Sequence, residues 1–240
     1  MTEPRRHDEE DQGSDLFFDG YFETYNEILK KNQRILSPSG KISYFAYHKI
    51  SILKRILPEN PRTLLEYGCG IGNNLGFLLQ LFPGVQIWGC DTSEKSLEAA
   101  RKRYPDVHFF PVSDRDDNTR QFDCVLIGDV IHHIPPERRM YYLKRISDCI
   151  RPGGYCVFFE HNPYNPLTRR LVSTCPFDAR ARLISLRNLR NLLLEQGLQV
   201  RISKYCFFFP EFLKVFDRFE DPLSLVPIGG KYYVLAVKAA

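Results

Sequence analysis

The 240-residue sequence has no apolar run long enough to cross a membrane and no apolar core behind its charged N-terminus, as a signal peptide would have. Its seven cysteines are an odd set without a Cys-x-x-Cys pair, so neither a disulfide framework nor a zinc site is indicated. Its 33 Lys and Arg are interspersed with 29 Asp and Glu, and a net charge of +4 does not favour nucleic-acid binding. These absences predict a soluble, cytoplasmic protein with no nucleic-acid partner and no membrane span.

The chain divides into three regions by composition. Residues 1–14 are polar and almost free of apolar side chains, which predicts a disordered leader. Residues 15–58 carry aromatic and apolar side chains at helical spacing and predict two or three helices. Residues 59–240 form the main domain, with a helix or loop inserted at about 211–231 before the last strand.

Short apolar runs alternate with helix-like segments from residue 62 onward. Seven of these runs predict strands, at residues 63–68, 85–91, 107–112, 122–128, 155–161, 198–210 and 231–239. Because the runs are apolar on both faces, we expect a mostly parallel sheet with helices on both sides. No helix is cleanly placed between the last two runs, which favours an antiparallel last strand. The predicted fold class is therefore α/β, a doubly wound seven-stranded sheet.

The stretch "LLEYGCGIGNN" places three glycines at the turn between the first strand and the next helix, where such sheets bind ligands. A dinucleotide fingerprint needs Gly-x-Gly-x-x-Gly, but the third position counted from Gly68 is Asn73, and no P-loop ending follows. The next strand ends in Asp91, where nucleoside-binding folds place a carboxylate for the ribose hydroxyls. This pair indicates an adenosine-containing ligand and leaves NAD open.

Several consecutive motifs carry a family resemblance that is strong over about residues 60–160. Glu66-x-Gly68-x-Gly70-x-Gly72, "FDCVLIGDVIHHIPPERR" and "RPGGYCVFFEHN" occur in that order. The chain resembles the class I S-adenosylmethionine-dependent methyltransferases of small-molecule type. The resemblance implies S-adenosyl-L-methionine as cofactor, and its cationic, phosphate-free methionine part suits carboxylates. The cofactor-binding residues it implies are Glu66, Gly68, Gly70, Gly72, Asp91, Asp114 and Asp129.

Methyl transfer needs a general base only when the acceptor loses a proton. His133, after the fourth strand, and His161, after the fifth, are the candidate catalytic residues, because histidine titrates near neutrality. No metal site is predicted. The loop "EHNPYNPLTRRLVSTCPFDARARL" follows the fifth strand, and its polar and arginine side chains suit a polar or anionic acceptor.

The resemblance also implies that the helices of residues 15–58 are a lid over the site. The segment at 211–231 puts Phe212, Val215, Phe216 and Phe219 along one helical face, which suits packing on the domain or a homodimer contact. Membrane association through this face is disfavoured, because Asp217, Glu220 and Asp221 would oppose an anionic surface.

The predicted function is methyl transfer to a small or carrier-linked molecule, by O-, N- or C-methylation. Two other functions stay open. One is a protein that binds S-adenosylmethionine for regulation or for a cyclase-like reaction without methyl transfer. The other is an NAD-dependent oxidoreductase, against which the missing third fingerprint glycine counts.

Overall fold

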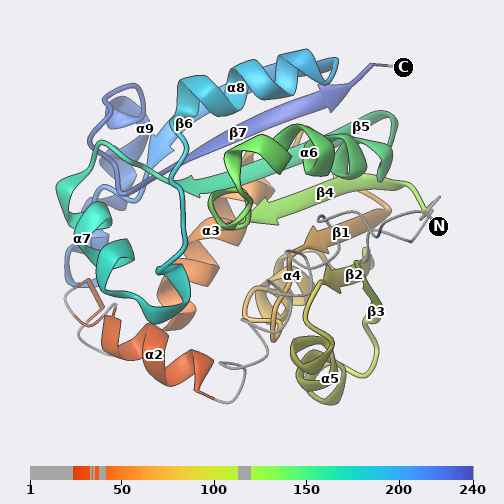
Figure 1. The fold of residues 1–240 in the computed structure, drawn as a ribbon, viewed down its shortest axis with the longest axis horizontal. Coiled ribbons are helices and arrows are strands. Elements are labelled where there is room, and N and C mark those ends of the chain that lie inside the picture. The colour runs from red at the N-terminus through yellow and green to blue at the C-terminus, as the bar shows by residue number, and fades with distance from the viewer. Residues whose placement is uncertain (1–23, 33, 35, 38–41, 113–119, 240) are drawn as a thin grey trace, which may run out of the picture.

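The computed structural model describes residues 24–32, 34, 36–37, 42–112 and 120–239. Its centre is one seven-stranded sheet in the order β3-β2-β1-β4-β5-β7-β6, shown in Figure 1. The strands are β1 (Thr63–Tyr67), β2 (Gln86–Asp91), β3 (His108–Pro111), β4 (Phe122–Gly128), β5 (Ile150–His161), β6 (Leu198–Cys206) and β7 (Lys231–Lys238). The predicted disordered leader, residues 1–14, lies outside the described residues.

The strands β3, β2, β1, β4 and β5 pair in parallel, and β7 pairs antiparallel with both β5 and β6. The carboxyl ends of β1, β2, β4 and β5 therefore meet at one edge of the sheet. Because β7 runs the other way, its first residue, Lys231, lies at that same edge beside His161, the last residue of β5.

The described helices are α2 (Tyr25–Asn32), α3 (Ile42–Ile56), α4 (Leu75–Leu81), α5 (Glu94–Arg103), α6 (Arg139–Asp148), α7 (Pro166–Thr174), α8 (Leu186–Glu195) and α9 (Glu220–Leu223). Four 3-10 turns join them: η2 (Ile131–His133), η3 (Pro136–Arg138), η4 (Pro176–Asp178) and η5 (Glu211–Phe219). No helix in the described part of the chain is long and apolar enough to span a membrane.

Two hydrophobic clusters cover the two faces of the sheet. On one face, Leu143 of α6 and Leu189 of α8 pack against Val125 and Phe158 of the central strands. On the other face, residues of α3 and α4 pack against the alternate side chains of the same strands, such as Leu126. Figure 1 shows α6 and α8 in front of the sheet and α3 behind it. This arrangement confirms the predicted doubly wound fold with an antiparallel last strand.

The structure departs from the sequence prediction in two segments. The stretch after β5, predicted as a loop, contains α7, which begins because Asn165 Oδ1 accepts a hydrogen bond from the amide of Thr168 and Pro166 occupies the first turn. The segment before β7 forms the 3-10 turn η5 and the four-residue α9 instead of one regular α-helix. At the start of α5, Ser93 is the N-cap and its side chain accepts a hydrogen bond from the amide of Ser96.

Candidate functional site

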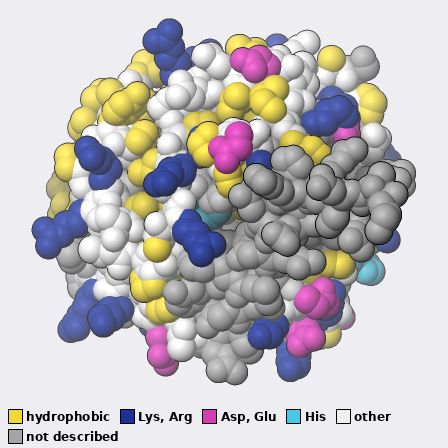
Figure 2. Space-filling view, viewed as in Figure 1, with side chains coloured by type: hydrophobic (Ala, Val, Ile, Leu, Met, Phe, Trp, Pro, Cys, Tyr) yellow, Lys and Arg dark blue, Asp and Glu magenta, His cyan; other side chains and the backbone are white. Residues whose placement is uncertain are grey.

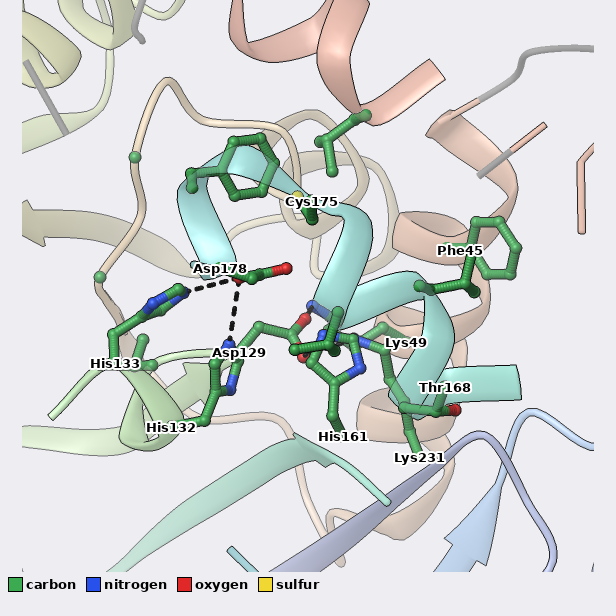
Figure 3. Close-up of a pocket in the computed structure, with 18 of the residues that line it drawn as sticks. Phe45, Lys49, Asp129, His132, His133, His161, Thr168, Cys175, Asp178 and Lys231 are labelled. Carbon is green, nitrogen blue, oxygen red and sulfur yellow. Dashed lines mark hydrogen bonds and ion pairs between the residues drawn. The ribbon is translucent and has the colours of Figure 1, made fainter. Parts of the chain in front are cut away.

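A cavity of about 920 Å³ lies at the carboxyl edge of the parallel strands. The glycine loop after β1 and Asp91 line one end of it. The other end is lined by the histidines that follow β4, by His161 at the end of β5, by α7 and η4, and by Lys231. Figure 3 shows that side chains from α3, β7 and the loop after β4 converge on this space.

The glycine loop fits a ligand that approaches its backbone closely. Gly68, Gly70 and Gly72 have φ angles of +76°, +51° and +81°, in the left-handed region that side chains rarely adopt. A Cβ atom on Gly68 would lie 2.5 Å from Val130 Cγ2, so this glycine allows close packing within the protein. A Cβ atom on Gly70 would meet nothing within 4 Å, although this residue lines the cavity. The open face of the loop is therefore at Gly70.

Glu66 at the end of β1 is buried, with 2% of its surface exposed. One carboxylate oxygen, Oε1, accepts a hydrogen bond of 2.5 Å from Asn74 Nδ2, whereas Oε2 has no hydrogen-bond partner among the described residues. Burial raises the pKa of Glu66 to about 7, against the opposing effects of Asn74 and Lys49. A buried oxygen without a donor fits a ligand that carries an ammonium group, because leaving it unpaired is costly.

Asp91 at the end of β2 joins the second strand to the glycine loop. Its Oδ2 accepts a hydrogen bond of 2.7 Å from the Gly70 amide, and its Oδ1 accepts one of 3.0 Å from the Ser93 amide. Asp91 also lines the cavity. Asp114, which the family resemblance implies as a contact of the adenine amino group, lies outside the described residues.

Asp129 follows β4 and lies between two lysines. Its Oδ2 is 2.7 Å from Nζ of Lys49, on α3, and its Oδ1 forms an ion pair with Nζ of Lys231, on β7. Its φ of +63° is unusual for a residue other than glycine. Burial would raise the pKa of Asp129, but Lys231 and Lys49 outweigh it and hold the pKa well below its usual range. The group holds two cations and one anion, so it carries one net positive charge.

His132 is fully buried and lies between two carboxylates. Its Nδ1 is 2.5 Å from Oε2 of Glu160, whose Oε1 accepts from the amides of Val130 and Ile131. Its Nε2 is 3.7 Å from Oδ1 of Asp178. Burial lowers the pKa of His132, but Glu160 and Asp178 outweigh it and raise the pKa to about 10. His132 is therefore an imidazolium at physiological pH.

The predicted catalytic residues His133 and His161 both line the cavity next to His132, with ring centroids 4.2 and 5.0 Å from it. Burial and the charge of His132 lower the pKa of His133 to about 3. Burial and Lys231 hold the pKa of His161 well below its usual range. Both rings are therefore neutral at physiological pH, and the lowered pKa values make them weak bases in this environment.

Asp178 approaches both neighbouring histidines, at 3.4 Å from His133 Nε2 as well as 3.7 Å from His132 Nε2, as Figure 3 shows. These three side chains could hold a metal ion by their spacing. The imidazolium of His132 already supplies a positive charge there, which lowers the pKa of Asp178 against the effect of burial. The geometry is explained without a metal, and the absence of a metal site stays a prediction.

The segment after β5 separates the arginines that the sequence grouped together. Arg180 and Arg182 line the cavity, and the Arg182 amide donates to the carbonyl of His132. Arg169 and Arg170 are exposed on α7. The predicted acceptor loop therefore brings only its second pair of arginines to the site.

Side chains of the helices α2 and α3 line the cavity, and the lid implied for these helices stays a prediction. These side chains include Leu29 and Asn32 of α2 and Phe45 of α3, and Asn32 Nδ2 donates to the carbonyl of Leu171 on α7. Figure 1 shows α2 beside α7. Tyr47 of α3 is exposed instead and packs on Phe77.

Sequence reasoning missed four groups of this site: Lys49, Glu160, Asp178 and Lys231. Lys49 and Lys231 are 182 positions apart in the sequence, and neither segment carries a pattern that predicts a contact with the other. Glu160 could have been found, because it is the only charge in the apolar run "YCVFFE" of a central strand. Such a residue needs a buried partner, which is His132.

The comparisons with known proteins agree with this geometry. A family model described as a methyltransferase domain matches residues 65–156. A trans-aconitate 2-methyltransferase of Acidovorax ebreus is 29% identical over 74% of this chain and 77% of its own length. A second, from Acidovorax sp., is 30% identical over 64% of each chain. These matches support a class I S-adenosylmethionine-dependent methyltransferase, the family that the sequence motifs resemble.

Solved structures of methyltransferases share the fold. An S-adenosylmethionine-dependent methyltransferase from Thermotoga maritima superposes with a TM-score of 0.63 at 22% identity, covering 93% of this chain and 99% of that one. A Haloferax volcanii methyltransferase in complex with its Trm112 activator gives a TM-score of 0.64 at 16% identity, over 93% and 98% of the two chains. The methyltransferase domain match, together with a neighbour of the same fold that binds S-adenosyl-L-methionine, supports S-adenosyl-L-methionine as the cofactor.

Proposed function

We propose that this methyltransferase acts on an anionic small molecule, and that a carboxylate of the acceptor binds beside Lys231 and Lys49. The observation that carries the proposal is the net positive charge of the Lys49–Asp129–Lys231 group at the cavity wall. Burial lowers the pKa of the Lys231 ammonium, and an added carboxylate would relieve this penalty. Relatives that act on trans-aconitate, a carboxylate, support the same class of acceptor.

The cofactor end of the cavity is assigned in the same proposal. Glu66 would accept from the ammonium of the methionine part through its unpaired Oε2. Asp91 would accept from the ribose hydroxyls, and the backbone at Gly68, Gly70 and Gly72 would face the nucleoside. Asp129 stays a proposed contact of the methionine part, although its oxygens already bind two lysines. Asp114 keeps its predicted role toward adenine.

When bound, S-adenosylmethionine supplies a methyl group on a cationic sulfur. A carboxylate acceptor has no proton to lose, so the chain would contribute mainly orientation and exclusion of water. Lys231 and Lys49 would orient the carboxylate, and α2 and α3 would close the cavity to solvent. For an acceptor that loses a proton, His161 and His133 stay the candidate bases at a ring nitrogen, although their lowered pKa values make both rings weak bases in this structure.

The test is transfer of a labelled methyl group to a set of mono-, di- and tricarboxylates and to the amides of the same skeletons. We expect turnover of the carboxylates and little of the amides. Lys231→Met should lower kcat/KM about 10- to 100-fold, mainly through KM, which is the scale of one hydrogen bond to a charged group. Lys204→Met, on the neighbouring strand β6 and away from the cavity, is the control. Equal turnover of amides, or an unchanged KM in Lys231→Met, would contradict an anionic acceptor.

Three finer predictions from the sequence stay proposals. A carrier-linked acceptor fits a cavity of about 920 Å³. Methyl transfer to a free carboxylate, without transfer to the same carboxylate bound to a carrier, would exclude a carrier-linked acceptor. A homodimer is tested by the mass of the protein in sedimentation. A cytoplasmic location fits seven buried free thiols, which persist in a reducing compartment.

A further inference from the structure

A concentration of exposed apolar side chains lies before the last strand. Thirteen large hydrophobic side chains are exposed among the described residues, and seven of them belong to residues 212–228. We call this stretch the apolar segment. Phe212 and Val215 of η5 are 63% and 64% exposed, and Leu225 and Ile228 after α9 are 78% and 60% exposed. Figure 2 shows hydrophobic side chains gathered over the part of the molecule where α9 lies in Figure 1. Surfaces of this kind mark interaction sites.

The acidic residues of the segment, which the sequence analysis took as an obstacle to an anionic surface, mostly bind inward. Asp217 accepts from the hydroxyl of Tyr44 on α3 at 3.2 Å. Glu220 is buried, with Oε2 2.9 Å from His48 Nε2 and Oε1 accepting from the Phe208 amide. Asp221 is exposed, but it lies 3.5 Å from Arg55 and 3.9 Å from Lys204. The obstacle seen in the sequence is therefore largely removed by the fold.

The cations of the segment remain outside. Lys214 and Arg218 are both exposed on η5 between the apolar side chains, and the Arg218 guanidinium lies 4.9 Å from the ring centroid of Phe219. The outward face of η5 thus combines phenylalanine and valine with positive charge. Interfacial segments that bind anionic lipid have this composition.

The segment is continuous with a second exposed strip at the start of α7. Asn165 Nδ2 donates to the carbonyl of Ile228 at 2.7 Å, which holds the two chain segments together. Tyr164 and Leu167, 64% and 38% exposed, extend the apolar surface there, and exposed Arg169 adds charge. Leu167 also lines the cavity, so this surface borders the site.

We propose that the apolar segment docks this protein onto an anionic lipid bilayer. Phe212, Val215 and Leu225 would enter the boundary between headgroups and acyl chains, while Lys214 and Arg218 would bind the headgroups. A second copy of the chain fits less well. A two-fold contact centred on η5 would bring Lys214 and Arg218 of both copies together, with the neighbouring acids turned inward.

The test is flotation of the full-length protein with vesicles of pure phosphatidylcholine and of phosphatidylcholine with about a third phosphatidylglycerol. We expect binding to the anionic vesicles, much weaker binding to the neutral ones, and release by salt. The double variant Phe212→Ser, Val215→Ser should lose at least tenfold in affinity. Replacing Lys214 and Arg218 by Ala should cost about fivefold for each cation, the scale of one basic residue near such a surface.

Leu194→Ser is the matched control, because Leu194 is 54% exposed on α8, outside the apolar segment. This variant should bind the vesicles as the unmodified protein does. Unchanged melting of each variant would show that the fold is intact. Failure to bind either vesicle, or equal binding of the serine double variant and the control, would overturn the proposal. Dimers in sedimentation that dissociate in the serine double variant would also overturn it and assign the face to a second copy.

Discussion

The ion pair of His132 and Glu160 predicts how the free energy of unfolding depends on pH. The native pKa of His132 is raised to about 10 from an unfolded value of 6.5, so between these values the native protein holds a proton that the unfolded chain has lost. Stability from this group is fully present below pH 6.5 and falls as pH rises toward 10. At 1.36 kcal/mol per pH unit, the loss between about pH 6.5 and about pH 8.5 is about 2 kcal/mol.

The measurement is urea unfolding, followed by circular dichroism, across that pH range. His132→Asn removes the titrating ring, so the variant should have a lower free energy of unfolding than the unmodified protein at about pH 6.5. Between about pH 6.5 and about pH 8.5, its free energy of unfolding should fall by about 2 kcal/mol less than that of the unmodified protein. The seven buried thiols also titrate at high pH, but both proteins share them and their effect cancels. His133→Asn is the control, since the His133 ring is already neutral throughout this range. Equal pH slopes in the unmodified protein and His132→Asn would refute a buried imidazolium.

Three further predictions concern the cofactor end of the cavity. Asp91→Ala should weaken S-adenosylmethionine binding by about 2–3 kcal/mol in calorimetry, and unchanged affinity would remove Asp91 from the ribose role. The pKa of Glu66 is raised to about 7, so this side chain loses its proton as the pH rises from about 5.5 to about 7. Over that range the affinity for the cationic cofactor should rise severalfold, because the carboxylate attracts it. Glu66→Gln should bind without this pH dependence, and a retained dependence would point to another group. Gly70→Ala should lose affinity and, because its φ of +51° strains any side chain, a little stability as well. Gly72→Ala should melt at a lower temperature than Gly70→Ala, since its φ is +81° and its Cβ would also lie 2.9 Å from Tyr104. The reverse order would contradict an open loop at Gly70.

The architecture could be predicted from the sequence because its signals are local. Each strand is a short apolar run, and the burial of Leu126 and Phe158 on opposite faces follows from alternation along such runs. The glycine loop could be predicted for the same reason, since Gly68 to Gly72 lie within five residues. Asp91 was found because it ends the strand next to the loop.

The proposed acceptor end of the cavity could not be predicted from the sequence, because its groups come from distant elements. Lys49 on α3, Asp129 after β4 and Lys231 on β7 form one ion-pair group only when the sheet is assembled. The sequence also could not tell which charges turn inward. Asp217 and Glu220 look like surface acids on a helical face, but the 3-10 geometry of η5 and the contacts with α3 direct them to the interior.

The reversed direction of β7 lets one edge of the sheet carry both the proposed cofactor site and the proposed acceptor site on different strands. The parallel strands place the glycine loop and Asp91 at the cofactor end of the cavity, where these strands end. The strand β7 runs the other way and begins at this edge, so its first residue, Lys231, lies there too. A change at position 231 therefore alters the wall at the acceptor end without touching the glycine loop or the strands that carry it. We expect substitutions on β7 to change acceptor preference more than cofactor affinity, because Lys231 reaches the proposed cofactor contacts only through Asp129. New acceptor preferences can therefore be engineered at β7.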